Sequence, residues 1–127
     1  MSGIIKVGMG SALGAMIRVS IDGSLVSFLG FSPYLALAVT NLLGCFLAGA
    51  FFNYMHAPQT GAISDRWHFW GIGFCGGFTT FASFVILLYQ GILEQRPVFV
   101  GIYSAFLIFG GILAFILGLL YSKRSQA

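Results

Sequence analysis

Four long apolar runs separated by short polar turns take up almost all of this sequence of 127 residues. Charged side chains make up only 7% of it, whereas they make up about 25% of a typical soluble domain. A helix needs about 20 mostly apolar residues to cross a bilayer. We therefore predict an all-α integral membrane protein, a single domain over residues 1–127, with four transmembrane helices at about residues 3–20, 34–54, 68–90 and 98–121.

Acidic residues are confined to the predicted helix ends and turns. Asp22 begins the first connection, Asp65 closes a polar loop that starts at His56, and Glu94 opens the last turn. No carboxylate is therefore expected inside a span, where a proton-coupled antiporter needs one. The net charge of +3 reflects this scarcity of acids rather than a basic patch, so the sequence does not indicate a nucleic-acid partner.

The third apolar run has an unusual composition, because residues 71–84 read GIGFCGGFTTFASF. We predict that the helix loses its regular backbone at Gly76-Gly77 and resumes with Phe78, Phe81 and Phe84 on one face. Unpaired backbone groups are costly in lipid, so a break inside the membrane indicates an ion or solute site. The alternative is that the glycines only allow close helix packing.

A few side chains in the apolar runs have chemistry that suits an anion. Asn41 either forms a hydrogen bond between helices or donates its N–H to an anion. Arg18, at the expected end of the first helix, either extends to the membrane surface or faces a water-filled entrance. The positive ring edges of Phe81 and Phe84 can attract a small anion, although such a stripe is also ordinary helix packing.

The distribution of basic residues gives only a weak preference for one orientation in the membrane. One predicted side carries Lys6, Arg66, Lys123 and Arg124, and the other carries Arg18 and Arg96. Four thin helices can hardly enclose a hydrated pathway alone, whereas two subunits can line one between them. A chain that inserts both ways predicts an antiparallel dimer.

Residues 76–84 read GGFTTFASF, which resembles the signature GGFTTFSTF of the small four-helix fluoride channels (Fluc/CrcB). The resemblance extends to GSALGAMIR at residues 10–18 and to TNLLGCF at residues 40–46. It implies a dual-topology antiparallel homodimer in the lipid of the bacterial inner membrane, a central structural sodium ion (Na⁺) and no enzymatic activity. It also implies passive export of fluoride, which would lower fluoride toxicity.

The matching positions imply roles for individual residues. Phe81 and Phe84 correspond to the pore-lining aromatics and Asn41 to a fluoride donor. Gly76 and Thr79 correspond to the backbone carbonyl ligands of sodium.

We expect Ser83 and Tyr103 to continue the fluoride pathway, with Arg18 at its entrance. Leu87, Leu107 and Gly111 stand where family members often have a polar track. A related second subunit could supply that track. The rival classes are a proton-coupled small multidrug exporter and a membrane assembly protein that transports nothing.

Overall fold

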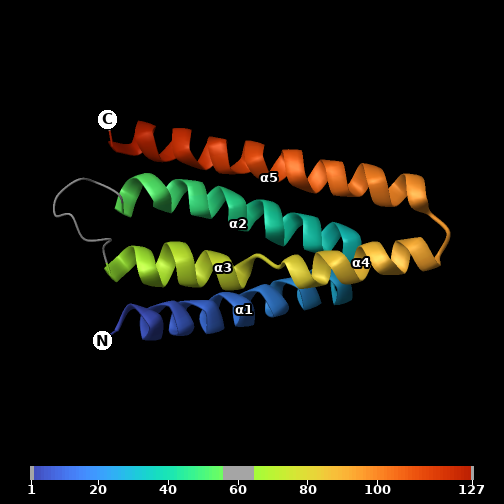
Figure 1. The fold of residues 1–127 in the computed structure, drawn as a ribbon, viewed down its shortest axis with the longest axis horizontal. Helices are drawn as coiled ribbons and strands as arrows, with labels where there is room; N and C mark the ends of the chain where they lie inside the picture. Colours follow the sequence, from blue (N-terminus) through green and yellow to red (C-terminus); the bar gives the residue numbers. More distant parts are fainter. Residues whose placement is uncertain (1, 56–64, 127) are drawn as a thin grey trace.

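The computed structural model describes residues 2–55 and 65–126 of the chain, and over these residues it forms four helical rods side by side (Figure 1). The rods are α1 (Gly3–Ser27), α2 (Pro33–Met55), a third rod of three segments, and α5 (Pro97–Gln126). The third rod consists of the π-helix η1 (Trp67–Phe74), α3 (Cys75–Phe78) and α4 (Phe81–Leu93). The predicted polar loop at residues 56–64 lies outside the described residues.

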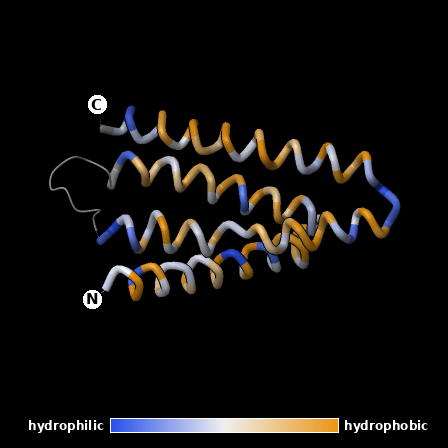
Figure 2. Tube along the Cα trace, viewed as in Figure 1, coloured by the Kyte–Doolittle hydropathy of each residue, from blue (hydrophilic) through white to orange (hydrophobic). Residues whose placement is uncertain are grey.

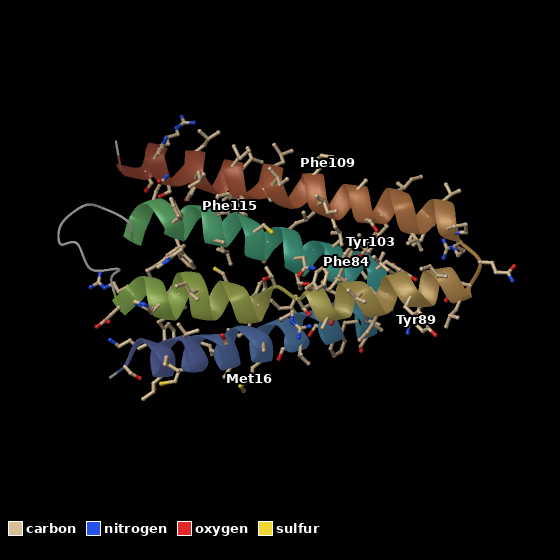
Figure 3. All side chains as sticks on the ribbon, viewed as in Figure 1. Met16, Phe84, Tyr89, Tyr103, Phe109 and Phe115 are labelled. Carbon is tan, nitrogen blue, oxygen red and sulfur yellow. The ribbon has the colours of Figure 1, made fainter. Side chains whose placement is uncertain are left out.

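All four rods are long and apolar enough to cross a membrane, which confirms the four predicted spans. Their outward faces carry large apolar side chains, such as Phe109, which is 71% exposed, and Met16, which is 69% exposed. Both point away from the bundle in Figure 3. Short hydrophilic bands interrupt α1 and α2 within otherwise apolar helices (Figure 2).

Glycines set the close approach between α1 and the third rod. A Cβ added at Gly14 would overlap the carbonyl oxygen of Phe74 and would lie 2.8 Å from the amide nitrogen of Phe78. A Cβ added at Gly77 would overlap the carbonyl of Ser11. Small residues at such contacts let helix backbones meet in a membrane, where no hydrophobic force drives them together. The close-packing role of glycines in this region is therefore real.

The first helix is longer than predicted. We expected it to end near residue 20, with Asp22 opening a connection, but α1 continues to Ser27. Asp22 is accommodated inside the helix because it pairs with Arg18, one turn earlier. The connection to α2 lies at residues 28–32, where Gly30 adopts a φ of +67° that suits glycine.

The third rod is broken, as predicted, but the position of the break was predicted wrongly. Gly76 and Gly77 are helical within α3, and the extended residues are Thr79, with φ −81° and ψ 153°, and Thr80, with φ −142° and ψ 123°. Two extended residues change the rotational phase of the helix that follows. Phe78 is consequently 2% exposed and Phe81 76% exposed, so the three phenylalanines do not share one face.

Candidate functional site

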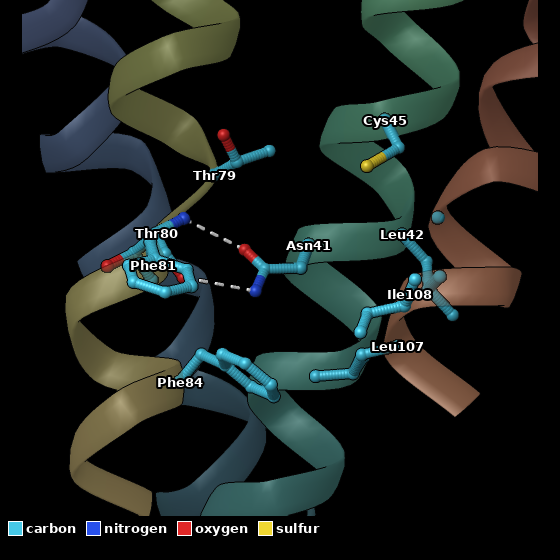
Figure 4. A pocket seen from close by; sticks show the side chains of 10 residues that line it. Asn41, Leu42, Cys45, Thr79, Thr80, Phe81, Phe84, Leu107 and Ile108 are labelled. Atoms are coloured by element: carbon cyan, nitrogen blue, oxygen red, sulfur yellow. Dashed lines mark hydrogen bonds between the residues drawn. The ribbon is translucent and has the colours of Figure 1, made fainter. Parts of the chain in front are cut away.

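The break in the third rod is held by a side chain from a neighbouring helix. The backbone N–H of Thr80 donates to Oδ1 of Asn41 at 2.9 Å, and Nδ2 of Asn41 donates to the carbonyl of Thr80 at 3.3 Å (Figure 4). Asn41 therefore pairs both backbone groups of one unwound residue. An amide nitrogen carries two hydrogens, so Asn41 can hold Thr80 and still donate to a solute.

The threonines of the break also cap the helices on either side. The hydroxyl of Thr79 donates to the carbonyl of Cys75 at 2.9 Å, at the end of α3. The hydroxyl of Thr80 accepts the backbone N–H of Ser83 at 3.2 Å, which caps the start of α4. The first turn of α4 thus begins beside Asn41, and a helix N-terminus favours negative charge.

These capping bonds divert two amides from their usual helical partners. In an α-helix the N–H of Thr80 would donate to the carbonyl of Gly76, and that of Ser83 to the carbonyl of Thr79. Here Thr80 donates to Asn41 and Ser83 donates to the Thr80 hydroxyl. The carbonyls of Gly76 and Thr79 are thereby left available, and carbonyl oxygens suit hard cations. They are the two positions to which the resemblance to the fluoride channels assigned sodium.

A cavity of about 320 Å³ lies beside the break, between the third rod, α2 and α5 (Figure 4). No charged side chain is among its lining residues, which are Asn41, Leu42, Cys45, Thr79, Thr80, Phe81, Phe84, Leu107, Ile108 and Gly111. Its polar groups are concentrated at the break and at Asn41, whereas the opposite wall, from α5, is apolar. The structure thus brings Asn41, Phe81 and Phe84 together in one cavity.

Two phenylalanines of α4, Phe81 and Phe84, line this cavity. The ring centroids of Phe81 and Phe84 lie 5.9 Å apart, with their planes inclined at 48°. Phe81 is largely exposed, so one wall of the site faces whatever surrounds this chain. Phe84 extends inward, and its ring centroid lies 6.4 Å from that of Tyr103 (Figure 3).

The structure places the other two predicted pathway residues outside this cavity. The hydroxyl of Tyr103 donates to the carbonyl of Tyr34 at 2.8 Å, and Tyr34 in turn donates its hydroxyl to the carbonyl of Leu87 at 3.0 Å. Ser83 lines a second cavity, of about 570 Å³, together with Asp22 and other residues of α1, α2 and α4. Sequence spacing could not separate these sites, because both depend on how the helices pack.

We expected Arg18 at the end of the first helix. It lies instead well inside α1, nine residues before the last residue of that helix. Its Nη1 lies 3.5 Å from Oδ2 of Asp22, and the two side chains are 17% and 24% exposed. The prediction that Asp22 falls at or beyond the end of the first helix was therefore wrong. Its position was misread because an Asp-Gly pair is a common turn signal in water-soluble chains.

Gly76 is exposed on the described chain, and a Cβ added there would meet nothing within 4 Å. Its neighbour Gly77 is packed against Ser11 instead. The carbonyls of Gly76 and Thr79 thus belong to a segment that is covered by α1 on one side and open on another. A second protein surface could approach the break from that open side.

Residues 5–119 match the family of CrcB-like proteins, Camphor Resistance (CrcB). The fluoride-specific ion channel FluC 3 of Brucella abortus is 31% identical over 122 residues, which cover 94% of this chain and 88% of that protein. FluC 1 of Streptococcus pneumoniae is 33% identical over 124 residues, covering 92% and 97% of the two chains. The FluC of Flavobacterium psychrophilum is 30% identical over 125 residues, covering 98% and 99%.

Proposed function

The chain belongs to the CrcB-like protein family, and we propose that it is a fluoride-selective ion channel through which fluoride leaves the cytoplasm passively. The observation that carries the proposal is the uncharged cavity in which Asn41, the helix break and two phenylalanine rings meet. The relatives named as fluoride-specific ion channels support it over nearly the whole chain. With its four apolar rods, the chain is a multi-pass membrane protein, and its role requires no enzymatic reaction.

The cavity offers several groups that can replace the water lost by a small anion. The free hydrogen on Nδ2 of Asn41 is a donor, and the positive edges of the Phe81 and Phe84 rings add weaker attraction. The N-terminus of α4 contributes a favourable dipole. Selectivity for fluoride over chloride follows when donors lie close enough together for the smaller ion and too close for the larger one.

The working unit in this proposal is an antiparallel homodimer with two fluoride pathways. The exposure of Phe81 and the open space beside Gly76 leave the broken rod accessible to a second chain. Two chains related by an axis in the membrane plane would bring their breaks together. Phe81 would then lie between subunits rather than against lipid.

The carbonyls of Gly76 and Thr79, whose helical donors are diverted, are suited to hold one structural sodium ion between the two breaks. When bound, the ion supplies positive charge that balances several carbonyl dipoles. The protein's own contribution is to hold these oxygens fixed, through the bonds that Asn41 and Thr80 form.

Ser83, Tyr103 and Arg18 belong to the outer parts of the pathway in this proposal. Ser83 and the Asp22 side chain share the second cavity, which lies across the first turn of α4 from Asn41. Tyr103 supports the ring of Phe84, and Arg18 provides positive charge on the α1 side.

A proton-coupled exporter is kept as the second candidate because Asp22, a titratable carboxylate, lies inside α1 and lines a cavity. Its ion pair with Arg18 disfavours this role, because the carboxylate already has a charged partner within the described chain. A membrane assembly protein that transports nothing is the third class. The three classes differ in which ions cross a membrane.

Purified protein in liposomes loaded with potassium fluoride tests the proposal. Valinomycin carries the potassium, and a fluoride electrode follows efflux. We expect rapid fluoride release without a pH gradient and no comparable release from chloride-loaded liposomes. Release that requires a pH gradient would favour the exporter, and no release of either anion would favour the assembly protein.

A further inference from the structure

Arg18 and Asp22 form an ion pair at the level of the helix break. α1 and the third rod begin at the same end of the bundle and run in the same direction (Figure 1). Gly14 packs against the backbone of Phe74 and Phe78. One helical turn beyond Gly14, Arg18 therefore comes level with the residues that follow Phe78. The charges of this pair lie beside the candidate site rather than at the end of a span.

The pair is only partly satisfied by its own contact. The single hydrogen bond between the two side chains is long, at 3.5 Å. Nε of Arg18 and Oδ1 of Asp22 are buried and have no hydrogen-bond partner among the residues that the structure describes. A buried charge that lacks partners is costly. Arg18 therefore has an N–H group left to donate to an anion. Asp22 competes with that anion for the guanidinium.

The second cavity connects this pair to the proposed pathway. Asp22 from α1 and Ser83 from α4 both line it. The Ser83 hydroxyl lies 3.4 Å from that of Thr80, and the backbone of Thr80 is bound by Asn41. Ser83 thus links the cavity that Asp22 lines to Thr80, which lines the cavity that contains the phenylalanines.

We propose that Asp22 limits fluoride entry by compensating the positive charge of Arg18 on the α1 side of the break. A lone guanidinium attracts an anion over several ångströms, whereas a cation beside a carboxylate acts as a dipole whose field falls off faster. Asp22 is thus a positioning residue for Arg18 and sets how strongly the entrance concentrates fluoride. This inference rests on the proposed channel function and adds a determinant of its rate.

Fluoride efflux from liposomes is measured for the parent and for Asp22→Asn, which removes the charge and keeps the shape. In Asp22→Asn the initial efflux rate at low fluoride concentration should rise by about threefold or more, because the attraction between Arg18 and fluoride increases. The increase should shrink at high ionic strength, because salt screens the exposed part of the interaction. Asp22→Glu keeps the charge and should conduct like the parent.

Two further variants separate this effect from general changes in charge or folding. Glu94→Gln removes an equal charge from the exposed pair with Arg96, in the α4–α5 turn, and should leave the rate unchanged. In an Arg18→Gln background, Asp22→Asn should lose most of its effect, because the cation it compensates is gone. Size-exclusion chromatography checks that each variant has the parent's oligomeric state.

The results distinguish a failure of this inference from a failure of the proposed channel function. A parent that conducts, with Asp22→Asn no faster than the parent, overturns this inference and leaves the channel function intact. If Asp22→Asn raises the efflux rate equally in the parent and in the Arg18→Gln background, the inference is also overturned. If Asp22→Asn does not fold, an Asp22→Glu variant that conducts faster than the parent overturns it. A parent that releases no fluoride overturns the proposed function and this inference together.

Discussion

Asn41 binds both backbone groups of Thr80, so one amide on α2 replaces the helical hydrogen bonds that the break removes from that residue. The same amide lines the cavity and carries a second hydrogen on Nδ2. Asn41 is consequently both a support for the break and a candidate donor to fluoride, and its substitutions test these roles separately.

Asn41→Asp should reduce fluoride efflux by about tenfold or more, since a hydrogen bond to a charged group contributes about 1.5–3 kcal/mol. The carboxylate can still accept from the N–H of Thr80, but it repels the carbonyl of Thr80 and any anion in the cavity. Asn53→Asp is the matched control, because Asn53 donates to the carbonyl of Leu119 near the other end of α2. Equal losses in both variants would argue against a specific role for Asn41.

Phe81→Ile and Phe84→Ile should each lower fluoride efflux strongly without changing the oligomeric state of the protein. Isoleucine fills much of the space of phenylalanine but lacks a positive ring edge. Phe109→Ile serves as the control, since Phe109 is exposed on α5 and is not among the lining residues of the cavity. If Phe81→Ile and Phe84→Ile release fluoride at the parent's rate, the two rings serve only in helix packing.

Gly77→Ala should destabilise the protein, whereas Gly76→Ala should leave the fold of each chain intact. An added methyl at Gly77 overlaps the Ser11 backbone, and overpacking of this kind costs about 1–3 kcal/mol. At Gly76 the methyl enters open space in one chain but would meet the partner's break in the proposed dimer. We expect Gly77→Ala to lower the melting temperature in detergent and Gly76→Ala to weaken dimerisation. A fully dimeric Gly76→Ala protein would contradict the proposed dimer interface.

If the proposed sodium site exists, removing sodium should lower the melting temperature of the protein, because a ligand that binds only the folded state stabilises it. The protein is purified with N-methyl-D-glucamine as the only added cation, and melting is followed as sodium is titrated back. Potassium at the same concentrations is the control for ionic strength. Identical melting curves in the two salts would count against a sodium site at Gly76 and Thr79.

The parent chain should conduct fluoride by itself, although Leu107 and Gly111 give the cavity an apolar wall. Asn41 and both phenylalanines, which form the middle of the proposed pathway, are present in the same chain. Gly111→Ser should increase efflux, because it adds a hydroxyl to that wall; a Cβ there would lie 3.4 Å from Sγ of Cys45, which is tight but tolerable. A well-folded parent dimer without flux would indicate that a related second subunit is required.

The four spans could be predicted from the sequence because membrane thickness fixes the length of an apolar helix. The existence of the break followed from the glycines and threonines of residues 71–84. Its position did not, because Thr80 can be extended only when Asn41, 39 positions away, pairs its backbone. The length of α1 was missed for a similar reason, since Arg18 makes Asp22 acceptable inside a helix.

The hydrogen bonds that hold the break come from an amide and two hydroxyls, none of which gains or loses a proton between about pH 5 and 8. Neither acidification of the medium nor a change in membrane potential therefore acts directly on these bonds, and we expect the route beside them to stay permanently open. A cell can tolerate such a leak only if nothing but fluoride uses it. The exclusion of chloride and protons, rather than a closing gate, would then preserve the ion gradients across the membrane.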